Sequence, residues 1–343
     1  MPTQAKASEA PMEGAVARLV EATMLGAFLV SLPVYLAVLT VIWRRRRRPP
    51  FDSPFFAVAF SLGLLDVTRL VVDWLLGKLP AYGRFGAHRL VMWRPAVFAK
   101  LYTLVFWYTS LAQTLGVLSL ALNRLCVLGM GKAWTTSQVR WNILSTWMLP
   151  LGGAAPLLFL QFDYHTFPYT GGVVARWRHS HWQRVYHVVC AVWCLLIALA
   201  CLVCYLYLWT AVRRRQRGSR RRRLLANCTA RTAAVAKRES SRRRAELKLA
   251  WLGVALFLMQ GVCSAFCYVK SKAAEGGGLP SQQDLMTAQI VIMDVYSWLN
   301  PYLLLTCSRS LRRHLWALLC CSRARESAPS SRSCLAPLSH KRL

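Results

Sequence analysis

The sequence predicts an all-α membrane protein, a bundle of seven transmembrane helices followed by a short amphipathic eighth helix. Seven long apolar runs divide the chain, and each is long enough to cross a bilayer, which takes about 20 mostly apolar residues. Arg and Lys gather on alternate sides of these runs. Hydrophobic residues make up 55% of the chain and charged residues 17%, so the chain is apolar despite a net charge of +31.

The predicted elements follow one another with short connections, except after the fifth span. A short extracellular segment (1–15) precedes a seven-span bundle (16–307), an amphipathic surface helix (308–321) and a disordered cytosolic tail (322–343). Hydropathy places the spans at 16–43, 55–76, 97–128, 143–162, 185–212, 249–269 and 286–307. The long connection at 213–248 is the third cytosolic loop, whose ends we expect to be helical extensions of the fifth and sixth spans.

The distribution of charge orients the predicted bundle. With the N-terminus outside, the cytosolic segments hold 31 Lys and Arg and the outer segments hold 12. Cytosolic loops carry the Lys and Arg excess in membrane proteins, so we expect a multi-pass plasma-membrane protein with an extracellular N-terminus and a cytosolic C-terminus. The net charge then indicates attraction to anionic lipid of the inner leaflet. Nucleic-acid binding is not favoured, because the basic residues flank apolar helices.

The segment after the seventh span has the pattern of a helix that lies on the membrane surface. Leucines recur at helical spacing from Leu311 to Leu319, while Arg309, Arg312 and Arg313 occupy the other face. Basic amphipathic helices of this kind bind in the interface plane. Cys320 and Cys321 at its end are candidates for palmitoylation, since juxtamembrane cysteines are common sites; the alternative is that they are ordinary reduced thiols.

The second span contains three ionisable residues, Asp66, Arg69 and Asp73. Each costs about 2.5 to 3.5 kcal/mol near a helix centre, so the stripe that they share has to face other helices. We expect Arg69 to pair with both aspartates along the helix and to bridge to Asp294, about 20 Å from the inner end of the seventh span at 1.5 Å per residue. We favour a fold-stabilising polar network; the alternatives are a conformational switch or an ion site around Asp66.

Two further pairs mark the inner ends of spans. Asn300-Pro301 in the seventh span belongs to the same predicted network, because proline removes a helical hydrogen bond and kinks the helix. Asn123-Arg124 ends the third span. The arginine could contact a cytosolic partner, or it could extend to the lipid headgroups.

These features together resemble the G-protein-coupled receptors, and among them the nematode serpentine chemoreceptors of class gamma. The likeness covers roughly residues 26–321 and is carried by the motifs Lys78-Leu79-Pro80, Gln113-Thr114-Leu115-Gly116, Leu120-Ala121-Leu122-Asn123-Arg124 and Asn300-Pro301-Tyr302-Leu303-Leu304-Leu305. The chain departs from rhodopsin-like receptors in two ways: its tyrosine directly follows Asn300-Pro301, and its outer loops at 78–100 and 163–184 hold no cysteine.

The resemblance implies a chemosensory receptor that binds a small molecule in the outer half of the bundle and activates a heterotrimeric G protein inside the cell. Depth and polarity then suggest the ligand pocket, and the inner end of the third span suggests the coupling site. The pocket candidates are Tyr102, Trp107, Gln113, Gln260 and Tyr296, and the coupling candidates are Asn123 and Arg124. The aromatic residues could instead only fill the core.

Other classes of protein fit the sequence less well. No Gly-rich phosphate loop, nucleophile motif or metal-ligand cluster is present in the sequence, so we expect a protein that is not an enzyme and has no cofactor or metal. A transporter or ligand-gated channel is the main alternative, with the intramembrane charges as its ion path. A seven-helix chaperone or scaffold without signalling is a further one.

Overall fold

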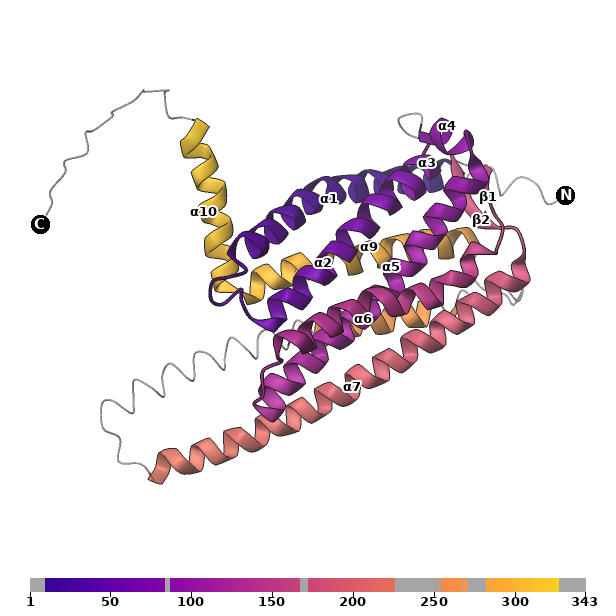
Figure 1. The fold of residues 1–343 in the computed structure, drawn as a ribbon. Helices are drawn as coiled ribbons and strands as arrows, with labels where there is room; N and C mark the ends of the chain where they lie inside the picture. Colours follow the sequence, from indigo (N-terminus) through magenta and orange to yellow (C-terminus); the bar gives the residue numbers. More distant parts are fainter. Residues whose placement is uncertain are drawn as a thin grey trace, which may run out of the picture.

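The structure, a computed structural model, describes residues 10–83, 87–166, 172–225, 251, 254–266, 268–269 and 282–326. Long helices lie side by side and form one bundle (Figure 1). They are α1 (Ala10–Arg45), α2 (Pro54–Val72), α5 (Pro95–Arg124), α6 (Thr136–Ala154), α7 (Ser180–Leu225), a helix over Val254–Phe266 and α9 (Gln282–Cys307). Each corresponds to one predicted span, in order.

Length and hydropathy single out four of these helices. Within the described residues, Arg18–Arg45, Pro54–Ala81, Pro95–Met130 and His181–Ala211 are long and apolar enough to cross a membrane, and Val254–Phe266 is a shorter apolar helix. The outer surface of α7 carries exposed apolar side chains such as Leu196, Val203 and Leu206. Contact with lipid chains stabilises such a surface, because it removes the apolar side chains from water.

The second span is longer than predicted and is not a regular helix. A π-helical turn, η2 (Asp73–Lys78), continues α2 and leads into the single turn α3 (Leu79–Ala81). A π-turn closes hydrogen bonds between residues five apart in the chain, so it brings Asp73 and Lys78 over one another. The same irregularity ends the third span, where η4 (Leu125–Met130) follows α5 and stops at Gly131, whose φ of 73° favours glycine.

The fourth span ends earlier than predicted. A short 3₁₀ turn, η5 (Ala155–Leu158), closes α6, and Phe162 begins a strand. Strands β1 (Phe162–Thr166) and β2 (Val173–Trp177) form an antiparallel pair in which Phe162 lies opposite Trp177. The expectation of helix up to Phe162 was therefore wrong, because Pro150 and Pro156 weaken the helix here. We call the end of the bundle with this pair and α4 (Ala87–Met92) the hairpin end.

Helix α5 is the centre of the bundle and packs against α2, α6 and α7. Leu62, Val117, Leu120 and Leu256 are among the buried residues of the main core. Glycine allows the closest approaches: a Cβ atom at Gly116 would lie 2.8 Å from Leu62 Cδ1. Small residues serve this purpose between membrane helices, where close backbone packing contributes to association.

Helix α10 (Arg309–Glu326) crosses the ends of α1 and α9 and points away from the bundle, at what we call the α10 end (Figure 1). Ser308 Oγ accepts a hydrogen bond from the Leu311 backbone N–H, at 3.2 Å, and Leu311 is fully buried. The helix continues five residues beyond the predicted 321. The third cytosolic loop lies outside the described residues from 226 onward, and so do the N-terminal residues 1–9 and the tail from 327 onward.

One of the three arginines predicted to face the headgroups has another role. Arg312 Nη1 donates to the backbone oxygens of Leu305 at 2.6 Å and Thr306 at 2.7 Å, and so caps the last carbonyl groups of α9. Arg309 and Arg313 are exposed, as the prediction requires.

Candidate functional site

Asp66 lies at the centre of a buried polar cluster that joins four helices. Its carboxylate accepts hydrogen bonds from the hydroxyl of Tyr35, from Gln113 Nε2 at 2.6 Å and from Asn300 Nδ2 at 2.9 Å. All four side chains are buried. These residues come from α1, α2, α5 and α9, and we call them the Asp66 cluster. Bonds to an ionised carboxylate are stronger than neutral ones, so this cluster fixes the relative positions of the four helices.

Arg69 adjoins the Asp66 cluster, but its contacts differ from those predicted. Its Nη1 atom donates to Ser110 Oγ and Gln113 Oε1, both at 2.7 Å, and its guanidinium lies 4.6 Å from the centre of the Phe106 ring. The expected ion pairs with Asp66 and Asp73 and the expected bridge to Asp294 were wrong. Ser110 and Gln113 of α5 lie closer to the arginine, and a different cation occupies the position next to Asp294.

That cation is Lys78. Its Nζ atom forms an ion pair with Asp73 Oδ2 at 3.0 Å and a second ion pair with Asp294 Oδ1. The hydroxyl of Tyr102 donates to the other oxygen of Asp73, at 2.9 Å. We call Asp73, Lys78, Tyr102 and Asp294 the Lys78 cluster. It links the second span to α5 and α9 nearer the hairpin end than the Asp66 cluster does, and Lys78 is only 1% exposed.

Aromatic side chains and the hairpin enclose the Lys78 cluster. The Nζ atom of Lys78 lies 4.8 Å from the centre of the Trp74 ring, and Phe28 stacks on Trp74 at 4.6 Å. From the hairpin, the hydroxyl of Tyr164 donates to the Leu76 carbonyl oxygen at 2.7 Å, and burial raises the pKa of that hydroxyl. The hydroxyl therefore stays protonated and able to donate at neutral pH.

The charges of the Lys78 cluster also act on Tyr82, the first residue after the second span. Burial raises the pKa of Tyr82 to about 12, and the charge of Asp294 is the largest of the electrostatic contributions in the same direction. Asp73 adds to the effect. The charges of Asp294, Glu21 and Asp73 thus all raise the pKa of Tyr82 in the same direction as its burial.

Four of the five predicted pocket residues are buried and Tyr102 is half-buried, and the structure distributes the five over several places. Tyr102 belongs to the Lys78 cluster and Gln113 to the Asp66 cluster. Trp107 packs edge to face against Tyr186, with ring centres 5.1 Å apart, beneath the hairpin. Buried side chains also include those of Gln260 and Tyr296, on the Val254–Phe266 helix and on α9.

Several buried polar atoms of α9 and its neighbours have no hydrogen-bond partner among the described residues. Those of α9 are Asp294 Oδ2, Tyr296 Oη, Ser297 Oγ, Trp298 Nε1 and Asn300 Oδ1, and those of the second span are Arg69 Nη2, Trp74 Nε1 and Lys78 Nζ, the last of which forms its two ion pairs instead. Buried polar atoms are normally paired, and each exception calls for an explanation such as a water, an ion or a ligand. The unpaired atoms belong to α9 and to its neighbour in the second span, where both clusters meet α9.

Asn123 and Arg124 lie at the opposite end of α5 and are buried, with exposed fractions of 0% and 3%. The Arg124 guanidinium lies 3.8 Å from the centre of the Phe55 ring. This geometry contradicts an arginine that extends to the headgroups. In this conformation the side chain is covered by Phe55, at the start of α2.

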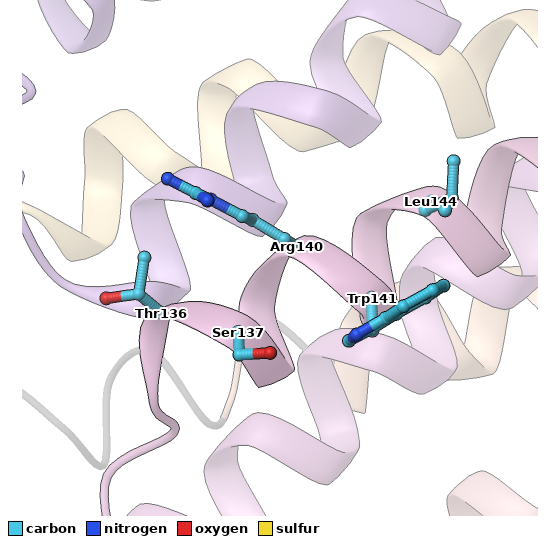
Figure 2. A pocket seen from close by; sticks show the side chains of 5 residues that line it. All are labelled: Thr136, Ser137, Arg140, Trp141 and Leu144. Atoms are coloured by element: carbon cyan, nitrogen blue, oxygen red, sulfur yellow. The ribbon is translucent and has the colours of Figure 1, made fainter.

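A recess of another kind lies on the surface of α6 (Figure 2). Thr136, Ser137, Arg140, Trp141 and Leu144 line it, and all five are exposed. It lies at the first turns of the helix, where Thr135 and Gln138 form a capping box. The recess contains no buried polar group. Among the described residues, no group of three or more His, Cys, Asp or Glu is placed to hold a metal ion.

Sequence reasoning missed Lys78 and Tyr35. Lys78 follows the predicted end of the second span and was counted among the outer charges. Asp73 and Lys78 are five residues apart, whereas side chains that meet on an α-helix are three or four apart, so their pairing was not predicted. A charged residue directly before Leu79-Pro80, on the extension of an apolar run, is the signal that could have located it. Tyr35 lies in an apolar run with no charged neighbour, and nothing in the sequence marks its contact with Asp66.

Comparison with known proteins identifies the family. The model of the serpentine type 7TM GPCR chemoreceptor Srv family matches residues 24–321. The chain is 25% identical to serpentine receptor class V-1 of Caenorhabditis elegans over 173 residues, which are 48% of this chain and 53% of that protein. The chain thus spans about half the length of the curated relative that it matches.

The fold is similar to that of squid rhodopsin, with a TM-score of 0.67, 15% identity and 93% of each chain covered. The predicted seven-helix fold is confirmed, and so is the serpentine chemoreceptor resemblance. The matched class is Srv, whereas the motifs resembled class gamma. The chain belongs to the serpentine type 7TM GPCR chemoreceptor Srv family of multi-pass membrane proteins.

Proposed function

We propose that the protein is a chemosensory receptor of the plasma membrane that binds a small molecule in the hairpin-end half of the bundle and activates a heterotrimeric G protein at the α10 end. The family supports a receptor of this type. The observation that carries the proposal is the line of buried polar side chains that joins the two halves. Such groups are costly inside a membrane and usually mark function.

The orientation follows from charge. Arg and Lys residues gather where helices end on the α10 side, in the run from Arg44 to Arg48 and in the run from Arg220 to Arg223 near the end of α7. Because cytosolic loops carry that excess, the α10 end faces the cytosol and the hairpin end faces the outside. Arg309 and Arg313 of α10 then lie at the inner leaflet, where they attract anionic lipid.

At the cytosolic end, Asn123 and Arg124 are the coupling residues that we propose. Arg124 is covered by Phe55, so a G protein reaches it only after α2 and α5 move apart. The Asp66 cluster lies between that point and the hairpin end and contains residues of both helices. A ligand that repositions α9 acts on Asn300, and hence on Asp66, and the change reaches α5 through Gln113.

A nucleotide-exchange assay tests this function. The full chain is reconstituted with purified heterotrimers of each Gα class, and guanine-nucleotide exchange is measured for wild type and Arg124→Ala. We expect exchange above the receptor-free rate for wild type and its loss for Arg124→Ala. Arg140→Ala is the matched control, because Arg140 is exposed near the same end. Equal exchange by Arg124→Ala and wild type would refute the role of Arg124, and no exchange with any class would refute coupling.

The same buried charges are the specific observation that favours a second candidate, a transporter or ligand-gated channel. Lys78 forms ion pairs with Asp73 and Asp294, and an ion path would need these pairs to open. Voltage-clamp recording from cells that express the full chain separates the two functions. A current that Asp66→Asn abolishes would favour a channel, and the absence of current alongside nucleotide exchange would favour the receptor.

We also propose palmitoylation at Cys320 and Cys321. Cys320 is exposed on α10, and so is the apolar ring of Trp316 one turn earlier, which supports the proposal that this thiol reaches the membrane surface. Acyl exchange with a biotin reagent measures the modification. We expect labelling of wild type and none for the double substitution of both cysteines by Ser; equal labelling of the two proteins would contradict the proposal.

A further inference from the structure

We infer that the small molecule carries a positive charge, and that the Lys78 cluster receives it as a protonated amine beside Lys78, at the oxygen of Asp294 that does not contact Lys78. This inference rests on the proposed function, which places the ligand in the hairpin-end half. It goes further by naming the chemical class of the ligand and the side chains that bind it. Charge, an unpaired oxygen and the contacts of Lys78 each support it.

The first support is the balance of charge along the second span and α9. Across the two clusters, the three carboxylates of Asp66, Asp73 and Asp294 outnumber the two cations, Arg69 and Lys78, and Arg69 bonds to Ser110 and Gln113 and not to a carboxylate. In the Lys78 cluster, two aspartates face the single cation of Lys78. One negative charge is left without a partner, and a buried charge is costly unless it is paired. A cationic ligand would supply the missing charge.

The second support is an acceptor without a donor. Asp294 is 2% exposed, and its Oδ1 atom contacts Lys78. Its Oδ2 atom has no hydrogen-bond partner among the described residues. A carboxylate oxygen accepts from N–H and O–H groups only, so the ligand that completes this site is a hydrogen-bond donor. A second ammonium group satisfies both the oxygen and the charge.

The third support is that the cluster already holds an ammonium group, that of Lys78. The Nζ atom lies between two carboxylates and 4.8 Å from the centre of the Trp74 ring. Cations are attracted to the faces of aromatic rings at this range, and this contact is a common way of recognising ammonium ligands. Phe28 and Tyr102 extend the aromatic surface, so an amine with an aryl group matches the surroundings in shape as well as in charge.

A thermal-stability assay tests this inference without any G protein. The full chain is purified in lipid nanodiscs, and its melting temperature is measured against increasing 2-phenylethylammonium or 2-phenylethanol. The two probes have the same shape and differ in charge, and sodium chloride at equal concentration controls for ionic strength. We expect the amine to raise the melting temperature and to bind about tenfold more tightly than the alcohol, because charge-assisted hydrogen bonds are the stronger ones.

Two substitutions locate the binding. Asp294→Asn removes one of the two negative charges of the Lys78 cluster and should reduce the affinity for the amine to that for the alcohol. Asp163→Asn is the matched control, since Asp163 is a partly exposed residue of the hairpin, and it should leave the preference for the amine intact. Equal effects of amine and alcohol on wild type would overturn the inference whether or not either variant folds.

An amine preference that survives in Asp294→Asn would overturn it as well. Failure of G-protein exchange together with a selective amine effect would refute the proposed coupling alone. The two claims can therefore fail separately.

Discussion

Replacing Lys78 by methionine should be among the most destabilising changes in the bundle. Methionine keeps most of the length of the side chain but removes the ammonium group. The substitution breaks both ion pairs of the Lys78 cluster and leaves the carboxylates of Asp73 and Asp294 buried. Removing one partner of a buried ion pair costs about 3 to 5 kcal/mol. We expect a loss at the upper end of that range, because two pairs are broken together.

The corresponding change at Asp294 should behave differently. Asp294→Asn leaves Lys78 paired with Asp73 at 3.0 Å and removes the uncompensated negative charge, so its cost should stay below about 1 to 2 kcal/mol, the size of one hydrogen bond. In the Lys78→Met background the same change removes one of two unpaired carboxylates. There it should increase stability, by about 1 to 3 kcal/mol. The effect of Asp294→Asn thus changes sign between the two backgrounds.

Thermal unfolding of the four purified proteins measures this double-mutant cycle. Lys100→Met is the matched control: Lys100 is a lysine of the hairpin end whose Nζ atom donates to the Leu158 carbonyl oxygen at 2.9 Å, and the change should cost little. The reasoning is refuted if Asp294→Asn has the same effect with Lys78 and with methionine at that position, or if Lys78→Met costs no more than Lys100→Met.

Two further substitutions probe the contacts around the clusters. Gly77→Ala should lower the melting temperature, because a Cβ atom there would lie 2.8 Å from the Tyr102 ring and displace the hydroxyl that binds Asp73. Gly152→Ala is the control, since its Cβ position has open space. Equal effects of the two substitutions would contradict the close packing of Gly77 against Tyr102. Asp66→Ala should cost about 2 to 6 kcal/mol, or about 1 to 3 for each unsatisfied buried group, since it leaves the Tyr35 hydroxyl and Gln113 Nε2 without this acceptor. Asp52→Ala, at an exposed position, should change the unfolding free energy by less than about 0.5 kcal/mol.

The order of the spans could be predicted from the sequence because the membrane imposes it. Each apolar run has to form a helix, since no water is present to pair with its backbone groups. The residues that break this pattern were harder to place. Phe162 reads as the end of an apolar run and begins a strand instead, and Asp73 to Lys78 read as ordinary helix and form a π-turn. Both depend on contacts with other elements, which local patterns do not contain.

The membership of the polar network was predicted in part. Asp66, Asp73, Asp294 and Asn300 are all buried, as intramembrane polar residues should be. Their partners depend on side-chain geometry: Arg69 bonds to Gln113, and Asp294 bonds to Lys78. Spacing along one helix predicts which residues share a face, but the other helices decide which of them meet.

The position of Arg124 illustrates the same limit at the other end of the bundle. An arginine at a helix end near basic loops suggests a surface residue, but its guanidinium lies against Phe55. The two residues are far apart in the sequence, so no local pattern relates them. The structure therefore adds a condition to the coupling hypothesis, which is that α2 and α5 have to separate before Arg124 is reached.

Sidedness tests the central claim most directly. Small epitope tags are placed before Met1 and after Leu343, and antibody labelling is compared between intact and permeabilised cells. The account predicts that the first tag is labelled on intact cells and that the second is labelled only after permeabilisation. The opposite pattern would place the Lys78 cluster in the cytosolic half and Arg124 in the outer half, and would contradict the receptor account.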